Sequence, residues 1–317
     1  MTALALALIL GVGLSTSAGA QTALPERGAY VGPPDPVKVQ AFSDAAGPPP
    51  TTYVASFVPR ATPDPEVRDF LAIDDWIEDN LEGDHPRLEG QSRRLVLSVP
   101  LVPNDSSLTD VIAGDGHRRL TRLGQALRDA GRGRSVVRLG WESNLRWPNW
   151  SAVGHEVEYR RAFRAVVRTL RAAAPGLRFE WNVGCKYPLP ASPEWYPGDH
   201  YVHLVGLDCY ATSAETGPWQ DKWQPALESV AAFAGQHSKR IAVSEWGQSR
   251  NDADLVTSFL CWANEHGVTY HIYWNALPKP GAKNPEDAED MRLWDLDTTP
   301  PSVLQPEAAE AYKANCP

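Results

Sequence analysis

Short runs of β-branched and aromatic residues alternate along this chain with longer segments whose apolar residues recur every three or four positions. The first pattern is typical of strands, and the second is typical of helices that bury one face. The clearest helical segment places Tyr159, Phe163, Val166 and Leu170 on one side and most of its arginines on the other. It stops before Pro175, as a helix followed by a turn should.

The alternation predicts eight strands and seven helices. The strands are expected at residues 28–32, 51–60, 94–101, 136–142, 178–183, 203–210, 240–247 and 268–275. The helices are expected at residues 37–46, 65–80, 117–130, 159–170, 224–236, 253–265 and 306–314, with a Pro-rich loop at 184–200. This order favours an α/β fold of one domain, the (β/α)8 TIM barrel. The alternative, a doubly wound open sheet, usually has a Gly-rich phosphate turn after its first strand, and GAYVGPPDP is not one.

Residues 1–20 are apolar and end in Ala18-Gly19-Ala20, which predicts a secretory signal peptide followed by the barrel domain at residues 21–317. A transmembrane anchor is the rival interpretation, although the stretch is short for a span and lacks flanking charge. Export to an extracellular location favours disulfides for the four cysteines. We expect Cys185 to pair with Cys209 and Cys261 with Cys316, while other pairings and free thiols stay open.

The chain carries 30 basic and 39 acidic residues, a net charge of −9, and no basic run. This argues against nucleic acid and anionic membrane surfaces as partners, because both require clustered Lys and Arg. Twelve tryptophans are the unusual feature of the composition. Flat indole rings stack on sugar faces, but buried rings in a core are the equally good alternative.

In a TIM barrel, the side chains of an active site converge at the carboxyl ends of the strands. Carboxylates, amides and tryptophans recur at these ends, and Glu142 on the fourth strand and Glu245 on the seventh are the notable pair. Neither a Ser/His/Asp order nor a metal-ligand spacing is evident, so we expect no metal and no organic cofactor.

Two carboxyl groups can split an acetal if one donates a proton to the leaving oxygen while the other attacks the anomeric carbon. A separation of about 5–5.5 Å gives retention of configuration, and a wider gap gives inversion. Arg138 and Tyr210 could donate hydrogen bonds to an ionised carboxylate here. The alternatives are that Glu142 and Glu245 are salt-bridged structural acids, that Asp208 caps a loop, and that Arg138 is a structural ion-pair partner.

Five segments resemble glycoside hydrolase family 26, the β-mannanase family: RLGWESN, FEWNVG, YPGDHYVHLVGLDCY, IAVSEWG and YHIYWNA. The resemblance implies Glu142 as acid/base and Glu245 as nucleophile, with Tyr210 hydrogen-bonded to the nucleophile. It also implies Trp274 as a platform under the cleaved sugar. The full set of candidate substrate-contacting residues is Arg138, Trp141, Asn144, Trp147, Trp150, Trp181, Asp208, Tyr210, Trp246 and Trp274.

The mannanases of this family carry His directly before the acid/base, and this chain carries Trp141 there. The sequence therefore predicts a divergent, monomeric, secreted, retaining endo-β-glycosidase of polysaccharide, acting on a β-mannan-type or related glycan. A glycan-binding barrel without activity, an inverting or phosphorolytic enzyme, and a glycosidase for the cell's own exopolysaccharide or cell-wall glycan remain the alternatives. The sugar and its linkage stay open.

Overall fold

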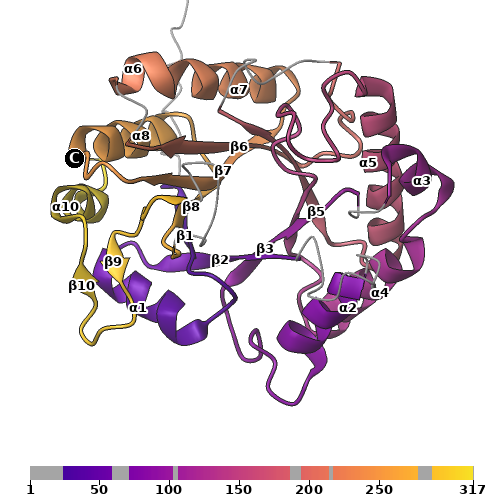
Figure 1. Cartoon of the computed structure of the whole chain (residues 1–317), viewed down its shortest axis with the longest axis horizontal. Helices are drawn as coiled ribbons and strands as arrows, with labels where there is room; N and C mark the ends of the chain where they lie inside the picture. Colours follow the sequence, from indigo (N-terminus) through magenta and orange to yellow (C-terminus); the bar gives the residue numbers. More distant parts are fainter. Residues whose placement is uncertain are drawn as a thin grey trace, which may run out of the picture.

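In a computed structural model of the chain, eight parallel strands close into a barrel in chain order, and β8 pairs back onto β1 (Figure 1). The structure describes residues 24–58, 71–102, 106–185, 194–213, 217–277 and 288–316. The strands are β1 (Glu26–Tyr30), β2 (Thr51–Phe57), β3 (Arg94–Val99), β4 (Val136–Leu139), β5 (Arg178–Gly184), β6 (Leu204–Ala211), β7 (Arg240–Gln248) and β8 (Tyr270–Trp274). The predicted (β/α)8 TIM barrel is confirmed.

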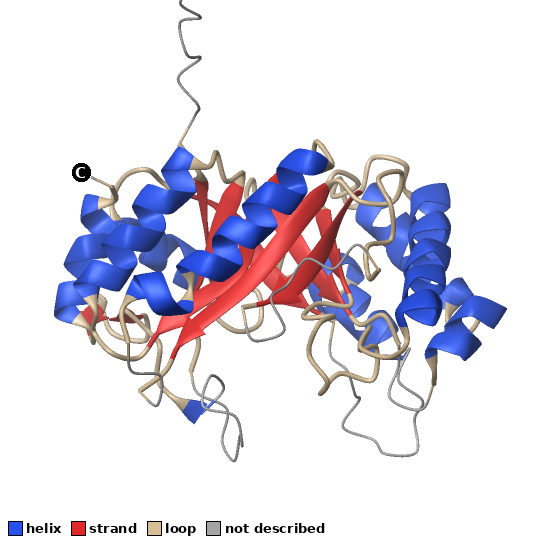
Figure 2. Cartoon of the chain, turned by 90° about the horizontal axis from the view of Figure 1, so that it is seen from above, coloured by secondary structure: helices blue, strands red, loops and turns tan. Residues whose placement is uncertain are grey.

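Helices surround the strands on the outside of the barrel (Figure 2). They are α1 (Pro36–Ala46), α2 (Leu71–Ile77), the π-helical segment η1 (Glu78–Glu82), α3 (Leu108–Ala113), α4 (His117–Asp129), α5 (Glu156–Ala173), α6 (Trp219–Lys222), α7 (Gln224–Gln236), α8 (Ala253–Glu265) and α10 (Pro306–Ala314). A small antiparallel pair, β9 (Trp294–Asp295) and β10 (Ser302–Val303), lies beside α1, where Trp294 contacts Phe42 edge to face (Figure 1).

Local sequence signals explain where several helices begin. The Asp35 side chain accepts hydrogen bonds from the backbone amides of Val37 and Lys38, and Pro36 occupies the first turn of α1. Asp252 caps α8 in the same way through the amide of Leu255. The sequence pattern missed α3, α6 and the β9–β10 pair, because elements of two to six residues are too short to show a period.

The difference from the predicted elements that matters most for the site lies at the end of β4, which stops at Leu139 rather than continuing to Glu142. Gly140 and Glu142 both have positive φ angles, +54° and +51°, so the chain leaves the barrel wall here. A Cβ at position 140 would also lie 2.7 Å from Cβ of Leu101. Only glycine fits this turn, and the turn moves Glu142 out of the strand into the following loop.

Side chains that point into the barrel form an apolar layer at the amino-terminal end and a polar layer above it. The apolar layer consists of Tyr53, Ala55, Val96, Val136, Leu204, Ala242, Tyr270 and Ile272. Two positions further along their strands, period-two alternation brings inward Arg138, Gly206 and Ser244. The polar layer therefore lies towards the carboxyl ends of the strands.

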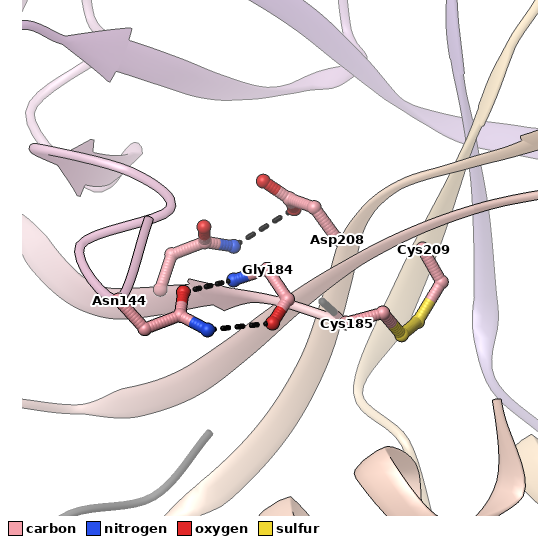
Figure 3. Close-up of a disulfide and its surroundings, with 6 residues drawn as sticks. Asn144, Gly184, Cys185, Asp208 and Cys209 are labelled. Atoms are coloured by element: carbon pink, nitrogen blue, oxygen red, sulfur yellow. Dashed lines mark hydrogen bonds between the residues drawn. A yellow bond between two sulfur atoms is a disulfide. The ribbon is translucent and has the colours of Figure 1, made fainter. Parts of the chain in front are cut away.

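Both predicted disulfides are present. Cys185 directly follows β5 and bonds to Cys209 in β6 (Figure 3), and Cys261 in α8 bonds to Cys316 beyond α10. The predicted signal peptide at residues 1–20 lies outside the described residues. Among the helices of the described part of the chain, none is long and apolar enough to cross a membrane.

Candidate active site

Glu245 lies near the carboxyl end of β7, where the strand carries one extra residue. Leu207 of β6 pairs with Val243 but Asp208 pairs with Glu245, so Ser244 is the additional residue of a β-bulge. Bulges of this kind re-aim side chains beside active sites. Ser244 and Glu245 consequently both contact residues inside the barrel, where strict alternation would send one of them outwards.

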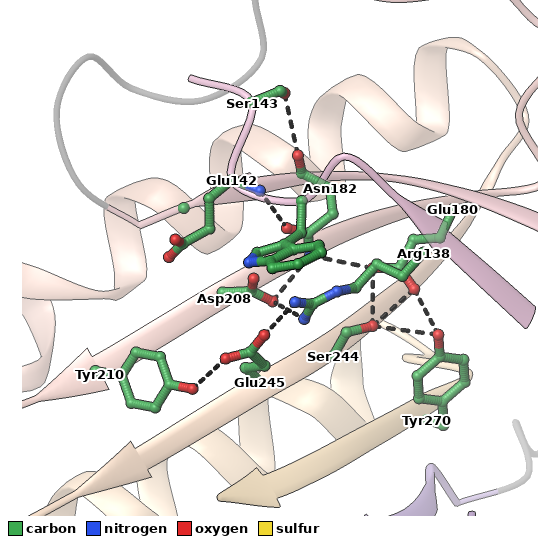
Figure 4. Close-up of polar contacts among 12 residues, drawn as sticks. Arg138, Glu142, Ser143, Glu180, Asn182, Asp208, Tyr210, Ser244, Glu245 and Tyr270 are labelled. Atoms are coloured by element: carbon green, nitrogen blue, oxygen red, sulfur yellow. Dashed lines mark hydrogen bonds and ion pairs between the residues drawn. The ribbon is translucent and has the colours of Figure 1, made fainter. Parts of the chain in front are cut away.

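Two donors hold the Glu245 carboxylate in place (Figure 4). Arg138 donates from Nη2 to Oε1, and the Tyr210 hydroxyl donates to Oε2. Burial, followed by the charge of Glu245, raises the pKa of Tyr210 well above its usual value, so this hydroxyl keeps its proton at neutral pH. Glu245 is 8% exposed, which leaves a small opening towards the barrel mouth.

Arg138 is completely buried and joins two carboxylates. Its Nη1 donates to Asp208 Oδ1 at 3.2 Å, while Nη2 binds Glu245. Its guanidinium carbon lies 5.2 Å from the ring centroid of Phe57 and 5.3 Å from that of Trp141, both within cation–π range. Burial opposes its charge, but the neighbouring carboxylates outweigh burial and raise its pKa. Arg138 thus holds the Glu245 carboxylate from inside the barrel, and contact between Arg138 and a substrate stays a prediction.

Asp208 is buried in β6 beside Arg138. Its Oδ1 accepts hydrogen bonds from Arg138 and from Asn182 Nδ2, at 2.8 Å for the latter. Burial raises the pKa of Asp208 well above its usual value, and the charges of Glu245 and Glu142 add to the rise although Arg138 opposes it. With 2% of the residue exposed, Asp208 is a buried partner of Arg138, and its contact with a substrate stays a prediction.

Glu142 occupies the loop after β4 in a left-handed backbone conformation, which is uncommon for a residue with a side chain. The loop is fastened by Asn182, whose Oδ1 accepts a hydrogen bond from the Glu142 amide at 2.9 Å. The Glu142 side chain is partly exposed and its Oε2 accepts a hydrogen bond from Trp147 Nε1 at 3.2 Å. Because its charge acts on Asp208 and Tyr210, Glu142 belongs to the same polar centre as Glu245.

Asn182 and Glu180 are the site residues that the sequence analysis missed. Asn182 links the Glu142 loop to Asp208 and also donates to Glu180 Oε1 at 3.1 Å. Glu180 is fully buried and accepts further hydrogen bonds from Ser244 and Tyr270 (Figure 4). Period-two alternation along β5 was the available signal, because it places residues 180 and 182 inside the barrel together.

The same alternation explains why Trp181 and Trp246, two tryptophans expected in the site, lie elsewhere. Trp181 lies between Asn182 and Glu180 in sequence and therefore points outwards, where it packs against Tyr196 and Phe233. Trp246 packs against Phe259 of α8. These two rings and Trp150 are completely buried, so none can contact a substrate.

Trp150 and Asn144 serve the loop rather than the substrate. Trp150 Nε1 donates to the backbone oxygen of Trp141 at 2.8 Å, which braces the chain just before Glu142. Asn144 uses both ends of its amide on Gly184: Nδ2 donates to the carbonyl at 2.9 Å, and Oδ1 accepts from the amide at 2.7 Å (Figure 3). Both residues fix the position of the loop after β4 relative to β5.

Aromatic rings stand opposite the carboxylates. Trp274, at the end of β8, lies 4.2 Å from the ring centroid of Tyr30 and 6.0 Å from that of Tyr210. Phe57 contacts Trp274, Tyr30 and Trp141 edge to face, so these rings form a continuous wall. Trp141 and Trp274 are each 8% exposed, and Trp147, beside Glu142, is 50% exposed. A flat apolar wall beside polar groups suits a pyranose ring, which has both kinds of surface.

Among the described residues, no group of three or more His, Cys, Asp or Glu side chains could hold a metal ion. The arrangement offers a carboxylate held by two donors, a second carboxyl group on a braced loop, and aromatic rings beside them. Such a set can break a glycosidic bond by acid–base and nucleophilic chemistry.

A comparison with protein families finds one similarity, which covers the middle of the chain. The model of glycosyl hydrolase family 26 matches residues 121–257, which include β4 to β7, Glu142 and Glu245. Over this stretch, which is less than half of the chain, the sequence is similar to glycosyl hydrolase family 26. The match ends before β8 and covers the part of the barrel that carries both candidate catalytic residues, Glu142 in the loop after β4 and Glu245 in β7. No curated protein matches the sequence.

Solved structures of family 26 enzymes share the barrel. The catalytic domain of the endo-β-1,4-mannanase from Bacillus sp. JAMB-750 is 16% identical, with a TM-score of 0.61 over 92% of this chain and 86% of that one. The Bacillus subtilis mannanase man26 is 15% identical, with a TM-score of 0.56 and 81% of each chain covered. A modular endo-β-1,4-mannanase from Cellulomonas fimi is 18% identical, with a TM-score of 0.57 over 83% of this chain and 69% of that one. At these identities the likeness shows the fold.

Proposed function

We propose that this protein hydrolyses a β-linked polysaccharide with retention of anomeric configuration, using Glu245 as nucleophile and Glu142 as acid/base. The observation that carries the proposal is the pair of donors, Arg138 and Tyr210, on the two oxygens of Glu245. Donors on both oxygens fix the orientation of the carboxylate that would attack the anomeric carbon. Glu142 is placed differently, on a braced loop with a partly exposed side chain, as a group that exchanges protons with substrate and water must be.

The reaction has two steps. A Glu245 oxygen attacks the anomeric carbon, the bond to the leaving oxygen breaks, and that oxygen takes the proton of Glu142. The product of this step is a glycosyl ester of Glu245. Ionised Glu142 then removes a proton from water, whose oxygen attacks the anomeric carbon and releases Glu245. Arg138 and Tyr210 receive the returning negative charge on the carboxylate.

The proposed substrate is a β-mannan-type glycan or a related β-glycan. The named solved relatives are mannanases, which makes mannan the first candidate. Trp274 is the proposed platform under the sugar that is cleaved, and exposed Trp147 would line a neighbouring subsite. Trp141 occupies the place before the acid/base and packs on Arg138 and Phe57, so this part of the wall is aromatic. We also propose that the enzyme acts inside the polymer chain, as a monomer.

We propose that the protein is secreted. The two disulfides support this proposal, because disulfides persist in oxidising compartments. Edman sequencing of protein purified from the culture medium should begin at Gln21. Intact Met1 on a cell-associated protein would contradict the proposed cleavage.

Sugar release from mannan, xylan, mixed-linkage β-glucan and a bacterial exopolysaccharide tests the activity. We expect the wild type to cleave at least one of them and Glu245→Ala to lose at least a thousandfold in kcat. Glu265→Ala is the matched control, since Glu265 is an exposed acid at the end of α8, and it should retain full activity. Equal rates for wild type and Glu245→Ala would refute the proposed nucleophile. Glycan binding without cleavage of any of the four would favour a barrel that only binds.

A further inference from the structure

The opposite end of the barrel contains a cavity of about 680 Å³. Its lining comes from the first residues of the strands and the turns before them, among them Tyr53, Val136, Leu204 and Thr269. Glu142 and Glu245 lie at the carboxyl ends of the same strands, so the length of the barrel separates this amino-terminal cavity from the candidate active site. Its volume falls within the range of small-molecule sites.

Arginine dominates the lining of the amino-terminal cavity. Six of the chain's 30 basic residues line it, namely Arg93, Arg94, Arg132, Arg134, Arg178 and Arg240. None of the lining residues, all of which belong to the described part of the chain, is Asp or Glu. The sequence shows no basic run because these arginines are spread over nearly 150 positions, and parallel strands bring them together by starting at the same end.

Three of the six arginines form hydrogen bonds or an ion pair with other parts of the protein. Arg132 donates to the backbone oxygens of Arg93, Leu88 and Gln91 and holds the turn before β4. Arg93 donates to the oxygen of Thr51, and Arg94 forms an ion pair with Glu26 at 2.6 Å. These contacts hold their side chains at the cavity.

Arg134, Arg178 and Arg240 are different. Each is exposed, and within the described ranges none has a side-chain hydrogen bond or ion pair. Positive charge at this end of the barrel also acts on its neighbour His203, whose pKa is lowered first by burial and then by Arg171 and Arg178. A protein of net charge −9 thus gathers uncompensated positive charge in one hollow.

We propose that the amino-terminal cavity binds a small ligand carrying two or more carboxylate or phosphate groups, held chiefly by Arg134, Arg178 and Arg240. Planar guanidinium groups bind both oxyanions in a two-pronged fashion, and several of them around one hollow select a ligand with several charges. The volume suits a ligand of two or three sugar units. The proposal does not depend on the hydrolase activity, because the two sites lie at opposite ends of the barrel.

Isothermal titration calorimetry of the full chain with two anionic probes tests the proposal and separates the sources of the charge. Trigalacturonate supplies carboxylates, tripolyphosphate supplies phosphates, and cellotriose is the neutral control. We expect at least one anionic probe to bind at one site per chain, and to bind at least tenfold more weakly in 500 mM than in 50 mM NaCl. The same probe should bind Glu245→Ala as tightly as wild type.

The decisive variant is Arg178→Gln/Arg240→Gln, which should weaken binding of the anionic probe at least tenfold. The matched control, Arg118→Gln/Arg161→Gln, removes the same charge from exposed positions on α4 and α5 and should stay within twofold of wild type. Arg178→Lys/Arg240→Lys keeps the charge, and its affinity for the anionic probe should lie between those of the Gln pair and the control variant. The proposal would be overturned if neither anionic probe bound wild type. It would also be overturned if the control variant lost as much affinity for the anionic probe as the Gln pair, or if the Gln pair weakened any binding of cellotriose.

Discussion

Replacing Arg138 by Met should destabilise the fold because it removes the cation that joins two carboxylates. The Met side chain fills similar volume between the rings of Phe57 and Trp141 but offers no charge. Asp208 and Glu245 would then face each other with 2% and 8% of their residues exposed and without their shared partner. Removing one member of a buried ion pair costs about 3–5 kcal/mol of unfolding free energy. This is a large part of the roughly 5–15 kcal/mol typical of a domain.

The loss should grow with pH. Asp208 has a raised pKa in the folded protein, so between its unfolded and folded pKa values the folded state binds more protons and stability falls as pH rises. Without Arg138, which opposes that rise, the folded pKa should climb further and extend the fall towards neutral pH. The variant should therefore lose more unfolding free energy relative to wild type at pH 8 than at pH 5.

Urea unfolding followed by tryptophan fluorescence at both pH values measures these differences. The double variant Arg138→Met/Asp208→Asn also removes one of the two carboxylates left without a partner. It should therefore recover at least about 1 kcal/mol of the lost unfolding free energy, because the effects of contacting residues are not additive. A loss below about 1 kcal/mol at pH 8, or equal losses at both pH values, would refute the reasoning.

Three further predictions concern the supports of the site. Asn182→Ala should lower kcat on the order of 100-fold, because it frees the loop that carries the acid/base. An unchanged kcat in steady-state kinetics would contradict this prediction. Gly206→Ala should lower the unfolding free energy by about 1–3 kcal/mol, since its Cβ would lie 2.5 Å from Cδ of Glu180, whereas Gly235→Ala, with open space around it, should not. Reduction of the two disulfides should lower the unfolding free energy by about 3–4 kcal/mol for each bond, because the bonds close loops of 24 and 55 residues. Urea unfolding midpoints measured with and without reductant test this prediction.

Periodicity predicted the barrel well because its strands and long helices repeat one pattern. The helices Gln224–Gln236 and Ala253–Glu265 have the predicted boundaries. The predicted end of β4 was wrong because the turn at Gly140 depends on close packing against Leu101, which lies 39 positions away in the sequence. A local sequence pattern cannot indicate such a contact.

The candidate site was predictable in part. Glu142 and Glu245 stand at strand ends that the pattern identifies, but the tryptophans were judged by residue type rather than by the side of the strand they occupy. Alternation would have moved Trp181 out of the site and brought Asn182 in. The bulge at Ser244 could not be foreseen, since it shows only in the pairing of β7 with β6. The six arginines of the amino-terminal cavity were invisible as a cluster for the same reason, because three-dimensional pairing brings them together.

The anomeric configuration of the first sugar released by wild type tests the central claim most directly. Proton NMR of a reaction started with a cleaved β-linked substrate should show the β-anomer of the new reducing end first, with the α-anomer appearing only as mutarotation proceeds. Glu142 and Glu245 acting as acid/base and nucleophile require this order. Immediate appearance of the α-anomer would mean that water attacks directly, and would contradict a covalent intermediate on Glu245.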